Sequence, residues 1–88
     1  MRSAFRASSE RDVRRIRSKR ILAGVKQAIL DVEAASRWSD VAAIKKSRGT
    51  ANAYRICIDD YRIGLFIESD LAEFVRVLPW RDIYRKFP

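Results

Sequence analysis

The sequence contains no histidine and a single cysteine, Cys57, and these absences exclude several kinds of chemistry. Without histidine, the chain has no imidazole to act as a general acid, a general base or a metal ligand. One cysteine cannot build a structural zinc site, which needs several thiolate or imidazole ligands, and it cannot close an internal disulfide. We therefore expect no metal site, and a reducing cytoplasm fits this composition.

The sequence also lacks long apolar runs. Its longest wholly apolar stretches are far shorter than the ~20 residues needed to span a bilayer, so no membrane-spanning helix is expected. The N-terminus is basic, but no apolar stretch follows it, so neither a signal peptide nor a membrane anchor is indicated. With 88 residues, the chain can enclose one small core. We expect one domain over residues 1–88, without an interdomain cavity for a small-molecule substrate.

Acidic residues are few relative to basic ones. The chain has 11 Asp and Glu against 19 Lys and Arg, which gives a formal charge of +8. Residues 1–26 hold nine of the basic side chains, opposed only by Glu10 and Asp12. A local charge run is most often a solvated helix face, but an excess over the whole chain favours an anionic partner. Nucleic acid or an acidic protein would fit.

Two amphipathic helices are predicted in the first half of the chain. Ser8 and Ser9 are good N-caps and predict that a helix begins there. A second helix is predicted over residues 21–32, because its apolar residues recur at spacings of three and four. Gly24 lies within it and weakens a helix by about 1 kcal/mol relative to alanine, so we expect it to permit close packing against the first helix or the sheet. An antiparallel pair is the simplest arrangement.

A basic loop is predicted to separate these helices from the strands. Residues 38–44 are expected to form a short turn, with Trp38 pointing inward. Lys45, Lys46 and Arg48 follow it and are placed in a loop. Gly49 would end any helix there, because glycine accepts a positive φ.

The strands are predicted from alternation of apolar and polar residues. Residues 54–58, 61–68 and 71–78 read as a meander of three strands, and residues 2–6 as a short first strand. Asp59 lies in the tight turn that joins the first two strands of the meander, because aspartate tolerates turn geometry.

Alternation also assigns the side chains of these strands to two faces. The more apolar face, which includes Ile56, is expected to be covered by the helices. The opposite face then presents Arg55, Cys57 and Arg62, whereas the side on which Arg76 lies is left open.

The last strand is expected to end at Pro79, which has no N–H to donate to a neighbouring strand. The tail from Trp80 is predicted to be a short helix or an extended segment across the sheet edge. The sequence thus predicts an α+β fold: two N-terminal antiparallel helices packed on a small, mainly antiparallel twisted sheet, followed by a short C-terminal helix or tail.

Five short motifs occur in a specific order in the second half of the chain. They are Lys45-Lys46-Ser47-Arg48-Gly49, Tyr54-Arg55-Ile56, Asp60-Tyr61-Arg62-Ile63-Gly64, Phe74-Val75-Arg76-Val77-Leu78 and Arg81-Asp82-Ile83-Tyr84. In this order the series resembles the RelE/ParE family of bacterial toxins, over most of the chain and most strongly over residues 45–88. The resemblance implies a RelE-like, microbial-RNase-type fold and the toxin role of a type II toxin–antitoxin system.

The resemblance also implies which residues serve the site. The positions that match the catalytic residues of the family members that cut messenger RNA on the ribosome are Arg55, Arg62, Arg81 and Tyr84. Basic residues near them are expected to bind RNA: Lys45, Lys46, Arg48, Arg76, Arg85 and Lys86. The expected activity is a metal-independent endoribonuclease (mRNA interferase) with no cofactor. Its expected partners are a cognate acidic antitoxin, messenger RNA and ribosomal RNA.

The sequence departs from the pattern of the family at three positions, and these departures leave two alternative functions open. Cys57 stands where such toxins often carry a second basic residue, and Pro79 and Trp80 stand where close relatives carry histidine and a basic residue. One alternative is a ParE-like protein that inhibits DNA gyrase without being an enzyme. Another is a decayed toxin that only binds its antitoxin.

Each site residue also has a simpler reading. Arg62 could pair with a nearby carboxylate of Asp59, Asp60 or Glu68, which is the default for an arginine on an exposed strand. Tyr84 could be only a packing anchor for the tail. Trp80 could stack on a base or form a lid over the core.

Overall fold

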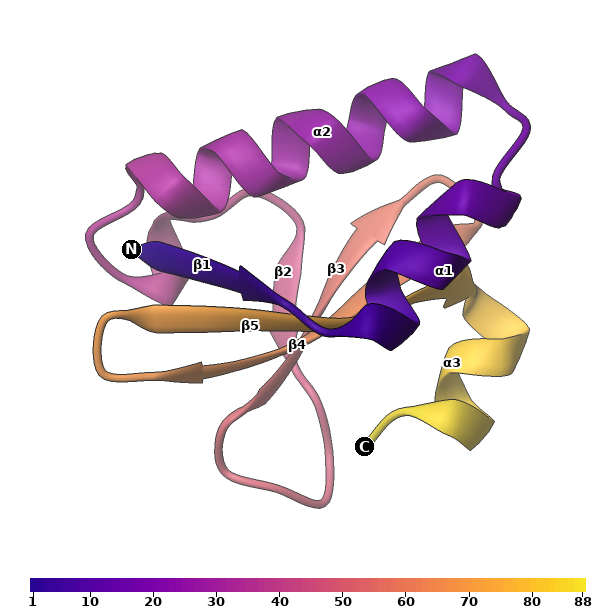
Figure 1. Ribbon diagram of the computed structural model, residues 1–88. Helices are drawn as coiled ribbons and strands as arrows, with labels where there is room; N and C mark the ends of the chain where they lie inside the picture. Colours follow the sequence, from indigo (N-terminus) through magenta and orange to yellow (C-terminus); the bar gives the residue numbers. More distant parts are fainter.

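A computed structural model describes residues 1–88 and has a five-stranded sheet between helices (Figure 1). In chain order the elements are β1 (Arg2–Phe5), α1 (Ala7–Arg15), α2 (Lys19–Ala34), a 3₁₀ turn (Trp38–Asp40), β2 (Ile44–Lys46), β3 (Ala53–Ile58), β4 (Tyr61–Glu68), β5 (Leu71–Pro79) and α3 (Trp80–Lys86). The spatial strand order is β1-β5-β4-β3-β2. The α+β fold predicted from the sequence is therefore confirmed.

The sheet is antiparallel except at one edge. β3, β4 and β5 form the predicted meander, and β2 pairs antiparallel with β3. β1 pairs parallel with the first half of β5, from Arg2 opposite Leu71 to Phe5 opposite Phe74. No helix of the structure is both long and apolar enough to cross a bilayer.

The first face of the sheet carries the main core. α2 buries Ile21, Val25, Ala28 and Val32 against it, which confirms the predicted helix and its apolar stripe. Gly24 explains how closely α2 approaches, because a Cβ at this position would lie 2.7 Å from Cγ2 of Ile58 in β3. The expected close packing at Gly24 is thus made with the sheet.

The start of α1 differs from the prediction. The helix begins at Ala7 after the cap residue Arg6, so Ser8 and Ser9 lie inside its first turn. Their hydroxyls do not accept bonds from helix N–H groups. Ser9 Oγ donates to the Arg6 carbonyl at 2.7 Å, and Ser8 Oγ donates to the Val75 carbonyl at 2.6 Å. Ser8 therefore serves a tertiary contact with β5, which local sequence cannot reveal.

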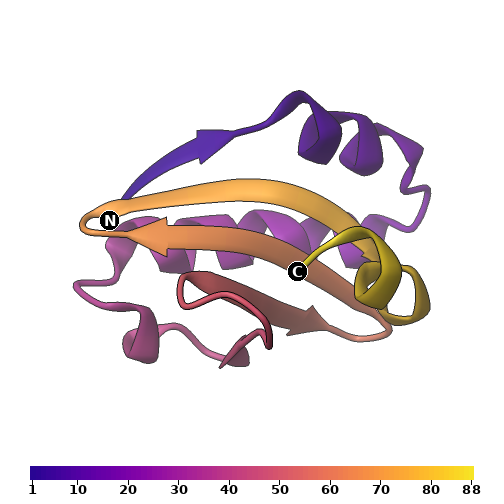
Figure 2. The same ribbon diagram turned by 90° about the horizontal axis from the view of Figure 1, so that it is seen from below.

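α1 covers the part of β5 that β1 leaves unpaired. The buried carboxylate of Asp12 accepts a hydrogen bond from the Val77 N–H at 3.0 Å, and Ser8 binds the carbonyl two residues earlier. Figure 2 shows α1 beyond the edge of the sheet, following β1. An exposed strand edge invites pairing with other chains, and α1 blocks this one.

The predicted basic loop is partly a strand. Lys45 and Lys46 belong to β2, where they lie opposite Arg55 and Tyr54 of β3. The loop begins only at Ser47, because the pairing with β3 extends through Lys46. The prediction that Lys45 and Lys46 lie in a loop was therefore wrong, and the strand fixes the face of the sheet to which each side chain points.

The tail covers the second face of the sheet and not its edge, which corrects the prediction. Seen from below, α3 lies in front of the sheet and α2 behind it (Figure 2). Ile83 and Phe87 are buried with Ala53 and Val75 in a second, smaller core. The tail can lie this close because Gly64 has no side chain: a Cβ there would lie 2.6 Å from Cγ of Phe87.

Gly64→Ala tests this contact. The added methyl group must displace the Phe87 ring, and overpacking of this kind costs about 1–3 kcal/mol. We expect the free energy of unfolding, measured in urea, to fall by that amount. In a Phe87→Ala background the same substitution should cost much less, because the clash is gone. An equal cost in both backgrounds would show that the ring is not what Gly64 accommodates.

Candidate nucleic-acid interface

Three neighbouring strands bring cations together on the second face of the sheet. Lys45 lies opposite Arg55, and Arg62 lies opposite Cys57. Residues directly opposite each other share a face, and the four side chains line a pocket of about 100 Å³ together with Tyr84 of α3. The sequence had predicted Arg55, Cys57 and Arg62 on this face.

Arg55 lines the pocket next to Tyr84. Its guanidinium carbon is 5.0 Å from the centroid of the Tyr84 ring, within the range of a cation–π contact. Its Nε is buried and has no hydrogen-bond partner in the protein. A buried donor without a partner costs about 1–3 kcal/mol, so such groups are rare in folded proteins. No acceptor of the protein therefore engages this side of the guanidinium group.

Arg62 is held by the turn between β3 and β4. Its Nη1 donates to the carbonyls of Asp59 at 2.9 Å and Tyr61 at 2.8 Å. The carboxylate of Asp59 is engaged by Arg20 instead, at 2.9 Å. Arg62 forms no ion pair, so the simpler reading in which a carboxylate neutralises it is not what the structure contains.

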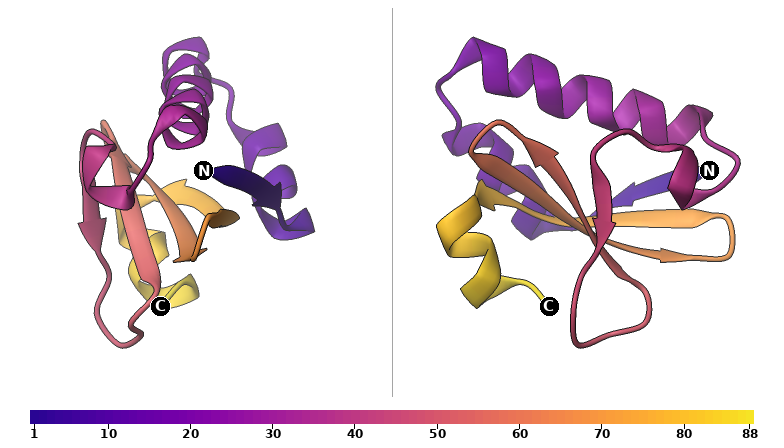
Figure 3. Two further views of the ribbon diagram at one scale, coloured as in Figure 1. Left: turned by 90° about the vertical axis from the view of Figure 1, so that its left-hand side faces the viewer. Right: turned by 180° about the vertical axis from the view of Figure 1, so that it is seen from behind.

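A second cavity adjoins the pocket. It has a volume of about 440 Å³ and shares Arg55 and Tyr84 with the pocket. Its other lining residues are Ser47, Arg48, Ile83, Phe87 and Pro88. The loop after β2 extends toward the C-terminal residues (Figure 3), and the Ser47 hydroxyl donates to the Pro88 carbonyl. Arg48 is therefore placed next to the predicted site.

No acidic side chain lines the pocket or the second cavity. Lys45, Arg48, Arg55 and Arg62 also form no ion pairs anywhere in the structure. Four positive charges thus converge without internal neutralisation, which gives this face a positive potential suited to a polyanion.

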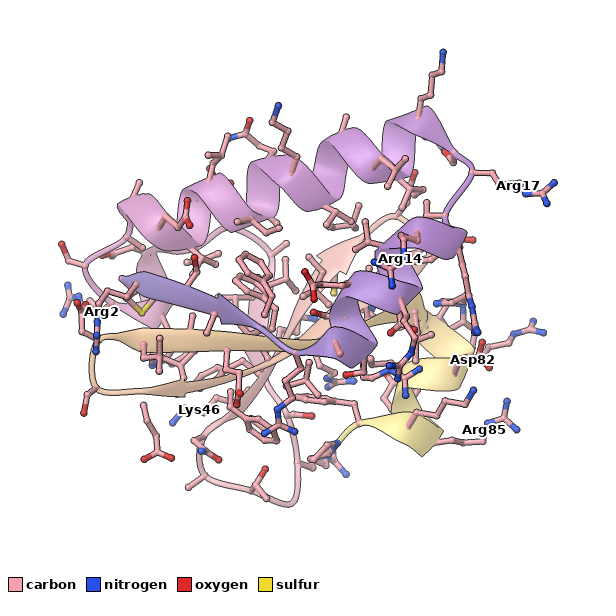
Figure 4. The ribbon with its side chains drawn as sticks, in the orientation of Figure 1. Arg2, Arg14, Arg17, Lys46, Asp82 and Arg85 are labelled. Carbon is pink, nitrogen blue, oxygen red and sulfur yellow. The ribbon has the colours of Figure 1, made fainter.

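Other predicted RNA-binding residues do not join this group. Arg76 binds the buried carboxylate of Asp12 through Nε at 2.8 Å and Nη2 at 3.1 Å. These hydrogen bonds raise the pKa of Arg76 above its ordinary value. Arg85 pairs with Asp82 on α3 at 2.9 Å (Figure 4). Both cations are therefore already neutralised by carboxylates of the protein.

The remaining candidates point elsewhere. Lys46 lies over Trp38, 5.5 Å from the ring centroid, and Lys86 lines a different cavity next to α1. Arg81 lines neither cavity of the site, and its guanidinium carbon lies 5.4 Å from the Trp80 ring. Trp80 is 43% exposed, so it is not a lid over the core. No group of three or more His, Cys, Asp or Glu side chains converges anywhere in the structure.

Sequence reasoning missed four residues that line the second cavity: Ser47, Ile83, Phe87 and Pro88. One signal could have indicated Phe87. A glycine in mid-strand, such as Gly64, often marks the close approach of another group, and a tail rich in aromatic residues follows in the chain. For Ser47 the sequence holds no comparable signal.

The fold and the site together define a class of protein: small α+β proteins whose sheet presents a cationic face beside a short C-terminal helix. No family model matches the sequence. The structure of the RelB-RelE antitoxin-toxin complex from Methanococcus jannaschii contains a similar chain, with a TM-score of 0.80 and 29% identity, over 97% of this chain and 99% of that one. The isolated Escherichia coli RelE toxin has the same fold, with a TM-score of 0.71 and 15% identity, over 98% of each chain.

A curated relative adds sequence evidence. Toxin RelE3 of Methanocaldococcus jannaschii is 47% identical over 45 residues, which are 51% of this chain and 51% of the relative. The chain thus matches about half the length of that relative. The sequence match to a RelE toxin and the structural similarity over nearly the whole chain together support the resemblance to RelE toxins that the sequence predicts.

Proposed function

We propose that residues 1–88 form one toxin domain of a type II toxin–antitoxin pair, and that it acts as a metal-independent endoribonuclease on messenger RNA in the ribosome. The observation that carries the proposal is the convergence of Lys45, Arg55 and Arg62 in a pocket without a carboxylate. The absence of any ion pair of Arg55 adds to it, because its charge stays available and a phosphate is the anion that an arginine fork fits best.

The residues of the pocket divide the chemistry of RNA cleavage between them. Attack by the 2′-hydroxyl on the adjacent phosphorus adds negative charge to the phosphate, and the leaving 5′ oxygen must gain a proton. Arg55 and Arg62 neutralise the phosphate, and Lys45 adds a third charge beside them. In this scheme Tyr84 orients the substrate or protonates the leaving oxygen; its exposure of 61% and its position next to Arg55 support this role.

This scheme does not keep every role that the sequence predicts. Neither cavity is lined by an imidazole or an acidic side chain that could remove the 2′ proton, so in this scheme that proton passes to solvent water, and the protein supplies charge stabilisation and the proton for the leaving oxygen. Arg81 lies outside the pocket and takes no step in this scheme. Lys46 and the arginines of α1 remain available to bind ribosomal RNA, and Arg17, in the segment between α1 and α2, points away from the protein (Figure 4).

The proposed partner is an acidic antitoxin that covers the cationic face. The net charge of +8 would favour association with a negatively charged segment. Structures from Methanococcus jannaschii, Escherichia coli and Mycobacterium tuberculosis with the same fold are described as complexes of toxin and antitoxin. The acidic segment would occupy the phosphate pocket and so compete with RNA.

Induction of the protein in growing cells, followed by primer-extension mapping of transcripts, tests the activity. We expect growth arrest and cuts in phase with codons. Arg62→Ala removes one charge-assisted hydrogen-bond donor to the phosphate, worth about 1.5–3 kcal/mol, so cleavage should fall roughly 10- to 150-fold. Arg2→Ala removes the same charge on β1, at the opposite edge of the sheet from β2, and should leave arrest and cleavage unchanged.

The same experiment separates the competing functions. If transcripts stayed intact and chromosomal DNA were broken, the protein would be a gyrase inhibitor and the proposed nuclease activity would be wrong. A decayed toxin would be harmless when produced alone and would still bind an acidic antitoxin; Cys57 favours this candidate, because it contributes no cation to the pocket. Full arrest by the Arg62→Ala variant would remove Arg62 from the mechanism.

A further inference from the structure

Four side chains form a continuous row beside the phosphate pocket, in which two neighbouring rings lie between two cations. The row runs from Arg55 to Tyr84, Trp80 and Arg81, and we call it the α3 row. Arg55 lies 5.0 Å from the Tyr84 ring, and Arg81 lies 5.4 Å from the Trp80 ring. The two rings meet edge to face, with centroids 6.3 Å apart.

The row is not required for packing of the tail. α3 is attached to the sheet through Ile83 and Phe87, which are 1% and 6% exposed, whereas Tyr84 and Trp80 remain 61% and 43% exposed. Large aromatic side chains left in solvent are informative, particularly when they are neighbours. Here they are neighbours in space and lead directly to Arg55.

The row also differs from other basic surfaces of the protein. Arg76 and Arg85 are bound by carboxylates, whereas Arg55 and Arg81 form no ion pairs and lie over aromatic rings. Their charge therefore stays available to an anion, and the rings hold the guanidinium groups in place. Basic groups interleaved with exposed rings are typical of surfaces that bind single-stranded nucleic acid, because bases stack on the rings while cations meet the backbone.

We propose that the α3 row is a stacking platform for bases of single-stranded RNA, on which Trp80 and Tyr84 bind nucleotides next to the phosphate held by Arg55. This inference rests on the proposed function, and it assigns Trp80 and Arg81 to substrate binding. Such a platform accepts any base, since every base has a π-face. It would lengthen the contact with messenger RNA beyond the phosphate pocket.

A partner protein is a less suitable occupant of this surface. An amphipathic helix of a partner would need an apolar groove for its aliphatic residues. The exposed residues of α3 include no aliphatic side chain; they are Trp80, Arg81, Tyr84, Arg85 and Lys86. Rings and cations of this kind match the chemistry of a nucleic acid better.

Tryptophan fluorescence can report on the platform directly. The other tryptophan, Trp38, packs on Tyr54 with centroids 5.0 Å apart, and Trp38→Phe leaves Trp80 as the sole indole. We expect a short, non-cleavable single-stranded RNA to quench Trp80 fluorescence in this variant. An abasic strand of the same length should bind through its phosphates, more weakly, and leave the fluorescence unchanged.

Substitution separates the contribution of bases from that of phosphates. Loss of one stacked base weakens binding by about 1–3 kcal/mol, so Trp80→Ala should bind the RNA roughly 5- to 150-fold more weakly and the abasic strand with unchanged affinity. Trp80→Phe should restore most of the affinity. Arg55→Ala should weaken binding of both strands, because it acts on phosphate. Circular dichroism and urea unfolding verify that each variant is folded.

The outcomes distinguish this inference from the function on which it rests. Equal losses for both strands in Trp80→Ala, or no loss, would overturn the stacking platform and leave the phosphate pocket intact. Binding of neither strand by the wild-type protein would overturn the proposed function and the platform with it. If Trp80→Ala weakened association with an acidic antitoxin but not with RNA, the row would be a protein-binding surface and the platform would be wrong.

Discussion

Arg55→Ala is expected to abolish growth arrest and to reduce messenger RNA cleavage by about 10²–10³-fold. Preorganised donors aimed at developing negative charge contribute rate factors of this size. Arg55 is the one cation that lines both cavities of the site, so its removal takes a positive charge from each of them. Arg55→Lys should recover only a small part of the activity, because an ammonium group has no planar fork and stacks poorly on Tyr84.

The same substitution should leave the fold nearly as stable as before. Removing Arg55 gives up the cation–π contact with Tyr84, which contributes about 0.5–2 kcal/mol. It also removes the buried Nε that lacks a partner, a cost of about 1–3 kcal/mol to the native state. These two effects oppose each other, so the midpoint of urea unfolding should change little. An arginine placed for structure would behave in the opposite way, with a large loss of stability.

Cys57 provides a direct assay of anion binding in this pocket. It is the only cysteine, and it lines the pocket with Lys45, Arg55 and Arg62, so a thiol-reactive reagent labels one defined position. Pyrophosphate is expected to slow this reaction in the wild-type protein and to have no effect in Arg55→Ala. The control Arg2→Ala, which removes the same charge elsewhere, should keep the protection. Equal protection in wild type and Arg55→Ala would exclude Arg55 as an anion ligand.

The parts of the fold that follow from local periodicity could be predicted from sequence. The stripe of α2 and the two faces of β3 and β4 are set by repeats of 3.6 and two residues, and each was predicted correctly. These faces were sufficient to bring Arg55, Arg62 and Cys57 together. The ion-pair partners of the charged side chains were not predictable, because Asp12 and Arg76 are 64 residues apart.

The tail and β5 show why local patterns were insufficient elsewhere. A register shift between Gly64 and Leu65 of β4 places Gly64 opposite Arg76 and Leu65 opposite Phe74. Val75 is thus an extra residue in β5, and such a bulge interrupts simple alternation. This is why the side of Arg76 could not be assigned from sequence. The covering of the second face by Phe87 likewise depends on Gly64, a contact between distant positions.

Asp12→Ala is expected to lower the free energy of unfolding by about 3–5 kcal/mol, the largest stability effect we predict. The Asp12 carboxylate is buried at 4% exposure and accepts three hydrogen bonds, two from Arg76 and one from the Val77 N–H. Removing one partner of a buried ion pair leaves the other charge without compensation, which costs this much. Because native domains are stable by only about 5–15 kcal/mol, the variant should unfold at much lower urea concentration.

Matched variants distinguish the energetic contribution of the Asp12–Arg76 ion pair from that of the hydrogen bond between Asp12 and the Val77 N–H at the edge of β5. Glu73→Ala breaks an exposed ion pair, in which the side chain of Glu73 is 35% exposed and that of Arg6 is 50% exposed. This substitution should lower the free energy of unfolding by less than about 1 kcal/mol. Arg76→Met in the Asp12→Ala background removes the uncompensated charge, so part of the stability should return while the Val77 N–H stays unbonded. Protection of Cys57 by pyrophosphate should persist in every one of these folded variants, because Asp12 and Arg76 line neither cavity of the site. If Asp12→Ala cost no more than Glu73→Ala, the attachment of α1 to β5 would have to depend on Ser8 and apolar contacts instead.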